Sequence, residues 1–97
     1  MRELKHRFIQ NRLEELPVLQ TAVTERNFEQ IRPIGHRMKG LAGCHGLDAI
    51  GAVSGAMEEA ALQQDASGVS AQLTKLTEAL RQAEAAALDD GSSGQAA

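Results

Sequence analysis

Residues 68–88 carry the most regular apolar pattern in the chain, with apolar side chains separated alternately by four and three positions. These residues are Val69, Leu73, Leu76, Leu80, Ala83 and Ala87. Because an α-helix turns once every 3.6 residues, this spacing places all six on one face. A helix with one apolar face gains most of its stability by packing that face against other elements. The segment therefore predicts one seam of a helical bundle.

Three further segments show helical spacing, and the composition favours an all-α protein. The hydrophobic fraction is 42%, mostly alanine and leucine, with two phenylalanines and no tryptophan or tyrosine. The β-branched and aromatic residues that strands prefer are therefore scarce. The other expected helices cover residues 3–26, 28–45 and 48–63. We predict an antiparallel up-down four-helix bundle, formed by a single domain over residues 1–88.

Proline, glycine and capping residues predict where the helices bend and end. Pro17 lacks a backbone N–H and crowds the preceding turn, so we expect a kink or a break there. Arg26-Asn27 is expected to form the first turn, because asparagine tolerates left-handed backbone conformations. Gly46 is expected to end the second helix, and Asp48 to cap the third.

The C-terminal residues predict a turn and then a flexible tail. Residues 65–68 (Asp-Ala-Ser-Gly) combine turn-forming side chains and are expected to precede the fourth helix. Residues 89–97 are polar, small and rich in glycine, so we expect them to form a disordered tail outside the bundle.

The net charge and the single cysteine limit the possible functions. The formal charge is −3 and no continuous basic stripe is present, so no nucleic-acid partner is expected. Cys44 has no second cysteine to pair with. The charged N-terminus does not resemble a signal peptide, and no apolar stretch is long enough for a membrane. We expect a cytoplasmic protein that is a monomer, because the bundle seam is satisfied internally.

Glycine is concentrated around one histidine, His36. Six of the nine glycines lie between residues 35 and 55, in segments that are otherwise predicted to be helical. Each glycine in a helix interior costs roughly 1 kcal/mol relative to alanine. This concentration indicates that something bulky must come close to the His36 ring.

A helical wheel of residues 28–45 places His36 on the solvent side. The inward side is expected to hold Ile31, Ile34, Met38, Leu41 and His45. The outward side is expected to hold Arg32, His36, Lys39, Gly40 and Gly43.

The outward group suits the chemistry of phosphoryl transfer. A neutral histidine ring is a competent nucleophile near neutral pH. Lys39 and Arg32 place positive charge where the oxygens of an incoming phosphoryl group would lie. Gly40 and Gly43 remove bulk beside the ring. The chain has no GxxxxGK[ST] loop and no dinucleotide fingerprint, so the phosphoryl group must come from another protein or a small donor.

The run His36-Arg37-Met38-Lys39-Gly40, followed by Gly46-Leu47 and Met57-Glu58, resembles the histidine-containing phosphotransfer (HPt) domain of multistep two-component phosphorelays. That family has a His-x-x-Lys-Gly core, a glycine ten residues after the histidine, and an apolar–acidic pair further on. All three elements occur at matching offsets, and the similarity covers about residues 8–61. Leu41 departs from the pattern, because a small residue is usual there.

The resemblance implies that His36 accepts a phosphoryl group from a receiver-domain aspartate, in a response regulator or a hybrid histidine kinase, and can return it. It assigns Lys39 as the charge beside the phosphoryl group and Gly40 as the position that leaves clearance for the partner. The partner-binding surface is expected to include Arg32, Arg37 and Gly43. We expect no cofactor or metal in this chain and no enzyme activity of its own, with Mg²⁺ held by the partner receiver.

Two other functions could use the same surface. One is a helical adaptor or inhibitor that binds a receiver or a histidine kinase without phosphoryl transfer. The other is the dimerising domain of a histidine kinase, which is disfavoured because the acidic residue and Thr-Pro kink usual after its histidine are missing. Zinc binding by Cys44, His45 and His36 is also disfavoured, since their wheel positions differ widely and no CxxC or HxxxH spacing is present. His6 and Glu58 are interpreted as solvated surface side chains.

Overall fold

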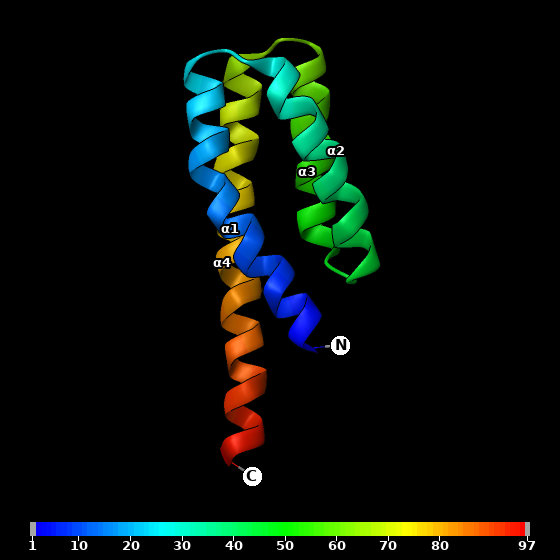
Figure 1. Ribbon diagram of the computed structural model, residues 1–97, viewed down its shortest axis with the longest axis vertical. Helices are drawn as coiled ribbons and strands as arrows, with labels where there is room; N and C mark the ends of the chain where they lie inside the picture. Colours follow the sequence, from blue (N-terminus) through cyan, green and yellow to red (C-terminus); the bar gives the residue numbers. More distant parts are fainter. Residues whose placement is uncertain (1, 97) are drawn as a thin grey trace.

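The computed structural model describes the backbone of residues 2–96 and the side chains of residues 4–87. It contains four helices, α1 (Arg2–Thr24), α2 (Phe28–Cys44), α3 (Asp48–Leu62) and α4 (Ala66–Ala96), and no strand within residues 2–96. The helices run alternately up and down (Figure 1), which confirms the predicted all-α bundle. The predicted tail, residues 89–97, lies outside the residues whose side chains are described.

The core follows the long axis of the bundle, and every helix contributes to it. On α4 the predicted seam is buried at Val69, Leu73, Leu76 and Leu80, and Ala83 packs at its edge. The buried apolar residues on the other helices are Phe8, Ile9, Leu16, Leu19, Ala22, Ile31, Met38, Ala42, Ile50, Met57 and Ala61. Burying one large aliphatic side chain contributes roughly 1.5–3 kcal/mol, so this core fixes the helices that carry the site.

The inward face of α2 differs from the predicted wheel. Its buried residues are Ile31, Gly35, Met38 and Ala42, whereas Leu41 is 38% exposed. The prediction that Leu41 lies inward is therefore wrong. The physical reason is Gly35, because a Cβ built there would lie only 3.1 Å from the backbone oxygen of Ser54 on α3. The two helices approach each other through a residue without a side chain, which a hydropathy wheel does not weigh.

The two prolines lie inside helices without interrupting them. α1 is continuous through Pro17, so no break occurs, although Figure 1 shows its N-terminal half turned away from the line of its C-terminal half. Pro33 lies inside α2, beyond the first turn. Its missing N–H leaves the carbonyl of Glu29, four residues earlier, without the usual helical donor.

In the first turn, Arg26 and Asn27 do not have the backbone conformations that were predicted. Arg26, not Asn27, adopts the left-handed conformation, with φ 55°. Asn27 instead caps α2, and its side-chain oxygen accepts a hydrogen bond from the backbone N–H of Gln30 at 3.3 Å. This is the usual use of asparagine at a helix start.

The other turns confirm one prediction and correct two. Gly46 has φ +70° and ends α2, as predicted. The N-cap of α3 is Leu47, so Asp48 is the first helical residue and not the cap. The last turn covers residues 63–65 instead of 65–68, and α4 begins at Ala66. Gln64 is left-handed there, and the Asp65 carboxylate accepts from the backbone N–H of Gly68 at 3.0 Å.

Replacing Ser54 with alanine is expected to stabilise the protein. Ser54 is fully buried on α3, and its hydroxyl has no hydrogen-bond partner among the described residues. A buried polar group without a partner costs about 1–3 kcal/mol. We expect Ser54→Ala to raise the free energy of unfolding by about 1 kcal/mol, measured by urea denaturation.

Ser70→Ala is the matched control, because Ser70 is exposed on α4 and undergoes the same change in helix propensity. The difference between the two variants isolates the effect of burial. A loss of stability in Ser54→Ala would contradict the prediction and would show that the hydroxyl has a partner in solution.

Candidate functional site

His36 projects from the exposed side of α2 toward its border with α3. Its side chain is 71% exposed, which confirms the predicted solvent position. Ring atom Nδ1 lies 3.0 Å from Oε2 of Glu58 on α3. The ring is therefore accessible to a partner and is held on one edge by a carboxylate.

Glu58 joins His36 to Lys39 through its two carboxylate oxygens. While Oε2 contacts the His36 ring, Oε1 lies 3.8 Å from Nζ of Lys39. The Glu58 side chain is only 21% exposed, so its interpretation as a solvated surface charge is wrong. The carboxylate is part of the site, and it balances the positive charge that α2 presents there.

The register of the α2–α3 hairpin is the feature that could have identified Glu58 as the neighbour of His36. Leu47 is the last residue of the connecting turn and the N-cap of α3. His36 precedes Leu47 by eleven residues (47 − 36) and Glu58 follows it by eleven (58 − 47). Lys39 and Gly55 each lie eight residues from Leu47. Both pairs are in contact in the structure, so residues of the antiparallel hairpin that lie equally far from Leu47 stand side by side.

The contact with Glu58 determines which nitrogen of a neutral His36 ring keeps a free lone pair. An ionised carboxylate can only accept hydrogen bonds, so Nδ1 must carry the proton in this contact. In the neutral ring, the free lone pair is then on Nε2. The carboxylate also favours the positive charge that develops on the ring when Nε2 attacks an electrophile.

Gly40 and Gly43 border His36 on α2 and leave open space around it. A Cβ built at either position meets no atom within 4 Å, so packing within the chain does not require glycine there. Neither residue has the positive φ that would favour glycine, which in the described residues is found at Gly46 alone among glycines. At both positions the helix surface near the His36 ring therefore carries no side chain.

The two predicted arginines have different surroundings. Arg32 lines a shallow hollow of about 360 Å³ together with His36 and Glu58. Arg37 lies on the other side of α2, where its Nη2 donates to Oε2 of Glu15 on α1 at 2.9 Å. Since Glu15 ties Arg37 to α1, the structure does not bring Arg37 to the His36–Glu58 pair.

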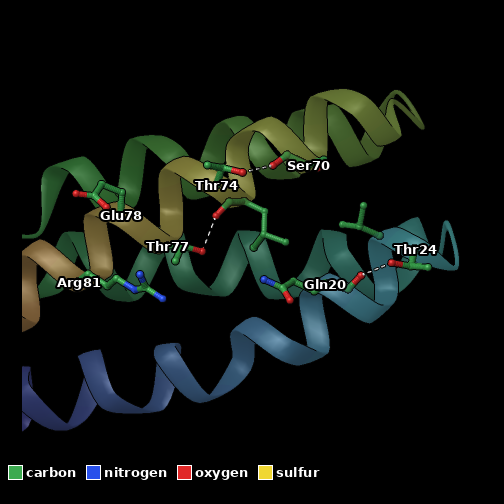
Figure 2. A pocket seen from close by; sticks show the side chains of 9 residues that line it. Gln20, Thr24, Ser70, Thr74, Thr77, Glu78 and Arg81 are labelled. Carbon is green, nitrogen blue, oxygen red and sulfur yellow. Dashed lines mark hydrogen bonds between the residues drawn. The ribbon is translucent and has the colours of Figure 1, made fainter.

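A second, larger hollow among the described residues shares no lining residue with this site. It is a groove of about 710 Å³ between α1 and α4 that contains none of the predicted site residues. Figure 2 shows that its hydroxyl groups turn back to their own helices, where Thr24, Thr74 and Thr77 donate to carbonyls one turn earlier. These three hydroxyls are therefore already paired within their own helices.

Cys44 and His45 do not join His36. Cys44 is exposed, and the His45 ring packs against Phe8 of α1 with 5.0 Å between ring centroids. Within the part of the chain with described side chains, no three or more His, Cys, Asp or Glu residues form a cluster suited to a metal. In the same part of the chain, no helix has the length and apolarity needed to cross a bilayer.

Comparison with known proteins gives one match. No curated protein and no solved structure is significantly similar to this chain. The family model described as "Hpt domain" matches residues 3–86, which include α1, α2, α3 and most of α4. Hpt domains are histidine phosphotransfer domains of two-component systems, and they act with receiver or kinase partners. The match covers the whole bundle and agrees with the resemblance found in the His36 to Glu58 segment, and the chain therefore belongs to the Hpt domain family.

Proposed function

We propose that this protein is a phosphocarrier in which His36 receives a phosphoryl group from a receiver-domain aspartate and passes it to or from a response regulator. The observation that carries the proposal is the 3.0 Å contact between His36 Nδ1 and Glu58 on an exposed helix face. This contact leaves Nε2 as the accessible nucleophile of the neutral ring.

The transfer step follows from this geometry. The Nε2 lone pair attacks the phosphorus of the partner's aspartyl phosphate and forms a P–N bond. The bond from phosphorus to the aspartyl oxygen breaks, and the aspartate leaves as a carboxylate. The ring now carries a positive charge, which the Nδ1–H···Glu58 contact stabilises. The reverse sequence of bonds returns the phosphoryl group, so the same site serves both directions.

Lys39 and Arg32 supply positive charge to the phosphoryl oxygens. Lys39 lies within 3.8 Å of Glu58 and therefore on the same border of α2 and α3 as the His36 ring. Arg32 shares the hollow beside His36. Phosphoryl transfer depends mainly on positioning and charge stabilisation, which cations at these two positions provide. Mg²⁺ belongs to the partner receiver in this scheme.

The partner docks on the face of α2 that holds His36, Gly40 and Gly43. The absence of side chains at the two glycines lets the partner's acidic pocket reach the ring. We propose a receiver domain, in a response regulator or a hybrid histidine kinase, as this partner. We place the encounter in the cytoplasm, where ATP-dependent kinases charge receivers, and we propose that the carrier acts as a monomer.

His36→Gln is expected to abolish phosphoryl transfer without unfolding the bundle, because His36 is exposed and makes no core contact. The measurement is transfer from a phosphorylated receiver to the purified protein. An acid-labile, alkali-stable label is expected on the wild type and on His6→Gln, the control, but not on His36→Gln.

Two outcomes would count against the carrier. Label that persists in His36→Gln would place the acceptor elsewhere. A receiver that binds wild type and His36→Gln equally, without labelling either, would favour the adaptor function instead.

Glu58→Ala is expected to slow transfer, whereas Glu58→Gln, which keeps an acceptor for Nδ1–H, is expected to slow it less. The contact is exposed on the histidine side, so a loss of roughly three- to tenfold is expected for alanine. Single-turnover kinetics with a phosphorylated receiver measure this. The label on wild type is expected at Nε2 by NMR of the phosphohistidine, and a label at Nδ1 would contradict the assigned role of Glu58.

Gly40→Ala is expected to separate stability from function. The added methyl group meets no atom of the chain, so the better helix propensity of alanine should stabilise the protein by about 1 kcal/mol. The same methyl group lies on the docking face and is expected to weaken receiver binding and slow transfer.

The control for Gly40→Ala is Ser70→Ala, which improves helix propensity on α4 away from His36. It should leave transfer unchanged. A Gly40→Ala protein that transfers at the wild-type rate would show that the partner does not approach over this position.

A further inference from the structure

Lys39 crosses from α2 to α3 over a third glycine, Gly55. A Cβ built at Gly55 would lie 3.0 Å from Cδ of Lys39 and 3.9 Å from its Cγ. Beyond Gly55 the Lys39 ammonium lies 3.8 Å from Oε1 of Glu58, one turn further along α3. The lysine stem therefore lies flat on α3, at the place where the side chain of residue 55 would be.

Neither the backbone nor the core explains why residue 55 is glycine. Its φ is not positive, so other residues could adopt its helical conformation. The atoms near the missing Cβ all belong to the Lys39 side chain, whereas at Gly35 they belong to the backbone of Ser54 and to Glu58. Glycine is a poor helix former. At position 55, glycine leaves room for the Lys39 side chain to lie against α3.

We infer that Gly55 is a positioning residue for Lys39, and that the absence of a side chain at 55 determines where this cation stands relative to His36. Lys39 and Gly55 lie equally far from Leu47, so the hairpin register brings them together just as it pairs His36 with Glu58. A bulky residue at 55 would lift the lysine stem away from α3 and move its ammonium off Glu58. The function assigned to Gly55 rests on the proposed phosphocarrier function.

The proposed role of Gly55 differs from that of Gly40 and Gly43 on α2. Gly40 and Gly43 have open space around the missing Cβ and act on the partner. At Gly55 the Lys39 side chain occupies this space, so Gly55 acts on a residue of its own chain. A substitution at 55 should therefore lose its effect once the lysine side chain is removed, whereas a clash with the partner would persist.

The test is a double-mutant cycle between positions 55 and 39, read out as the single-turnover rate of transfer from a phosphorylated receiver. Gly55→Ala needs Lys39 to give by a few tenths of an ångström and should transfer nearly as fast as wild type. Gly55→Leu should be slower by up to roughly fivefold, the size of an exposed charge contact. In the Lys39→Ala background, Gly55→Leu should cause no further loss. An equal loss in both backgrounds would overturn the proposal.

A second measurement separates this inference from the proposed function. In wild type, the NMR signals of the Lys39 side chain, observed with isotope-labelled lysine, should shift on Glu58→Gln. In Gly55→Leu they should not respond, and circular dichroism should show an intact helical fold. If wild type accepts no phosphoryl group but this NMR pattern holds, the phosphocarrier fails and the positioning role stands. If Lys39 responds to Glu58→Gln in both proteins, the positioning role is wrong whatever the transfer assay shows.

Discussion

The close approach of α2 and α3 at Gly35 determines the layout of the site. A Cβ at Gly35 would stand 3.1 Å from the Ser54 carbonyl oxygen and 3.3 Å from Glu58, so any larger residue would require α3 to move away by a few tenths of an ångström. The contact turns Gly35 inward and leaves its neighbour, His36, at the edge of the helix pair. At that edge Glu58 can reach the ring from α3. The geometry around His36, the proposed acceptor, thus follows from a packing contact one residue away.

The sequence predicts the helices and the exposure of His36 well, because periodic burial is encoded locally along each helix. It misplaces Leu41, because a wheel based on hydropathy turns the larger apolar residue inward and ignores glycine as a contact. It also fails to separate Glu58 from Glu59. In the structure Glu59 accepts from Gln63 of its own helix terminus, while Glu58 reaches across to α2. Composition cannot distinguish two adjacent acids, and only the register of the hairpin does so.

The turns are a second feature that the local sequence does not predict correctly. Arg26 and Gln64 adopt the left-handed conformation, although neither residue type favours it. The left-handed region costs an ordinary residue roughly 1–2 kcal/mol. Packing of the helices on either side offsets this cost, and each turn is followed by a side chain that caps the next helix, Asn27 or Asp65. Nonlocal packing therefore selects the left-handed residue, and the capping side chain lies one position after it.

The carboxylate of Glu58, which contacts both His36 and Lys39, affects how strongly the proposed site would bind a phosphoryl group. In the unloaded protein, Lys39 already has an anion to neutralise it. In the proposed carrier, a phosphoryl group on His36 would compete with Glu58 for that cation. Because an exposed charge contact is worth at most about 1 kcal/mol, this competition would lower the affinity for the phosphoryl group by a modest amount. In the proposed carrier it would bring acceptance and release closer in free energy, which favours transfer in both directions.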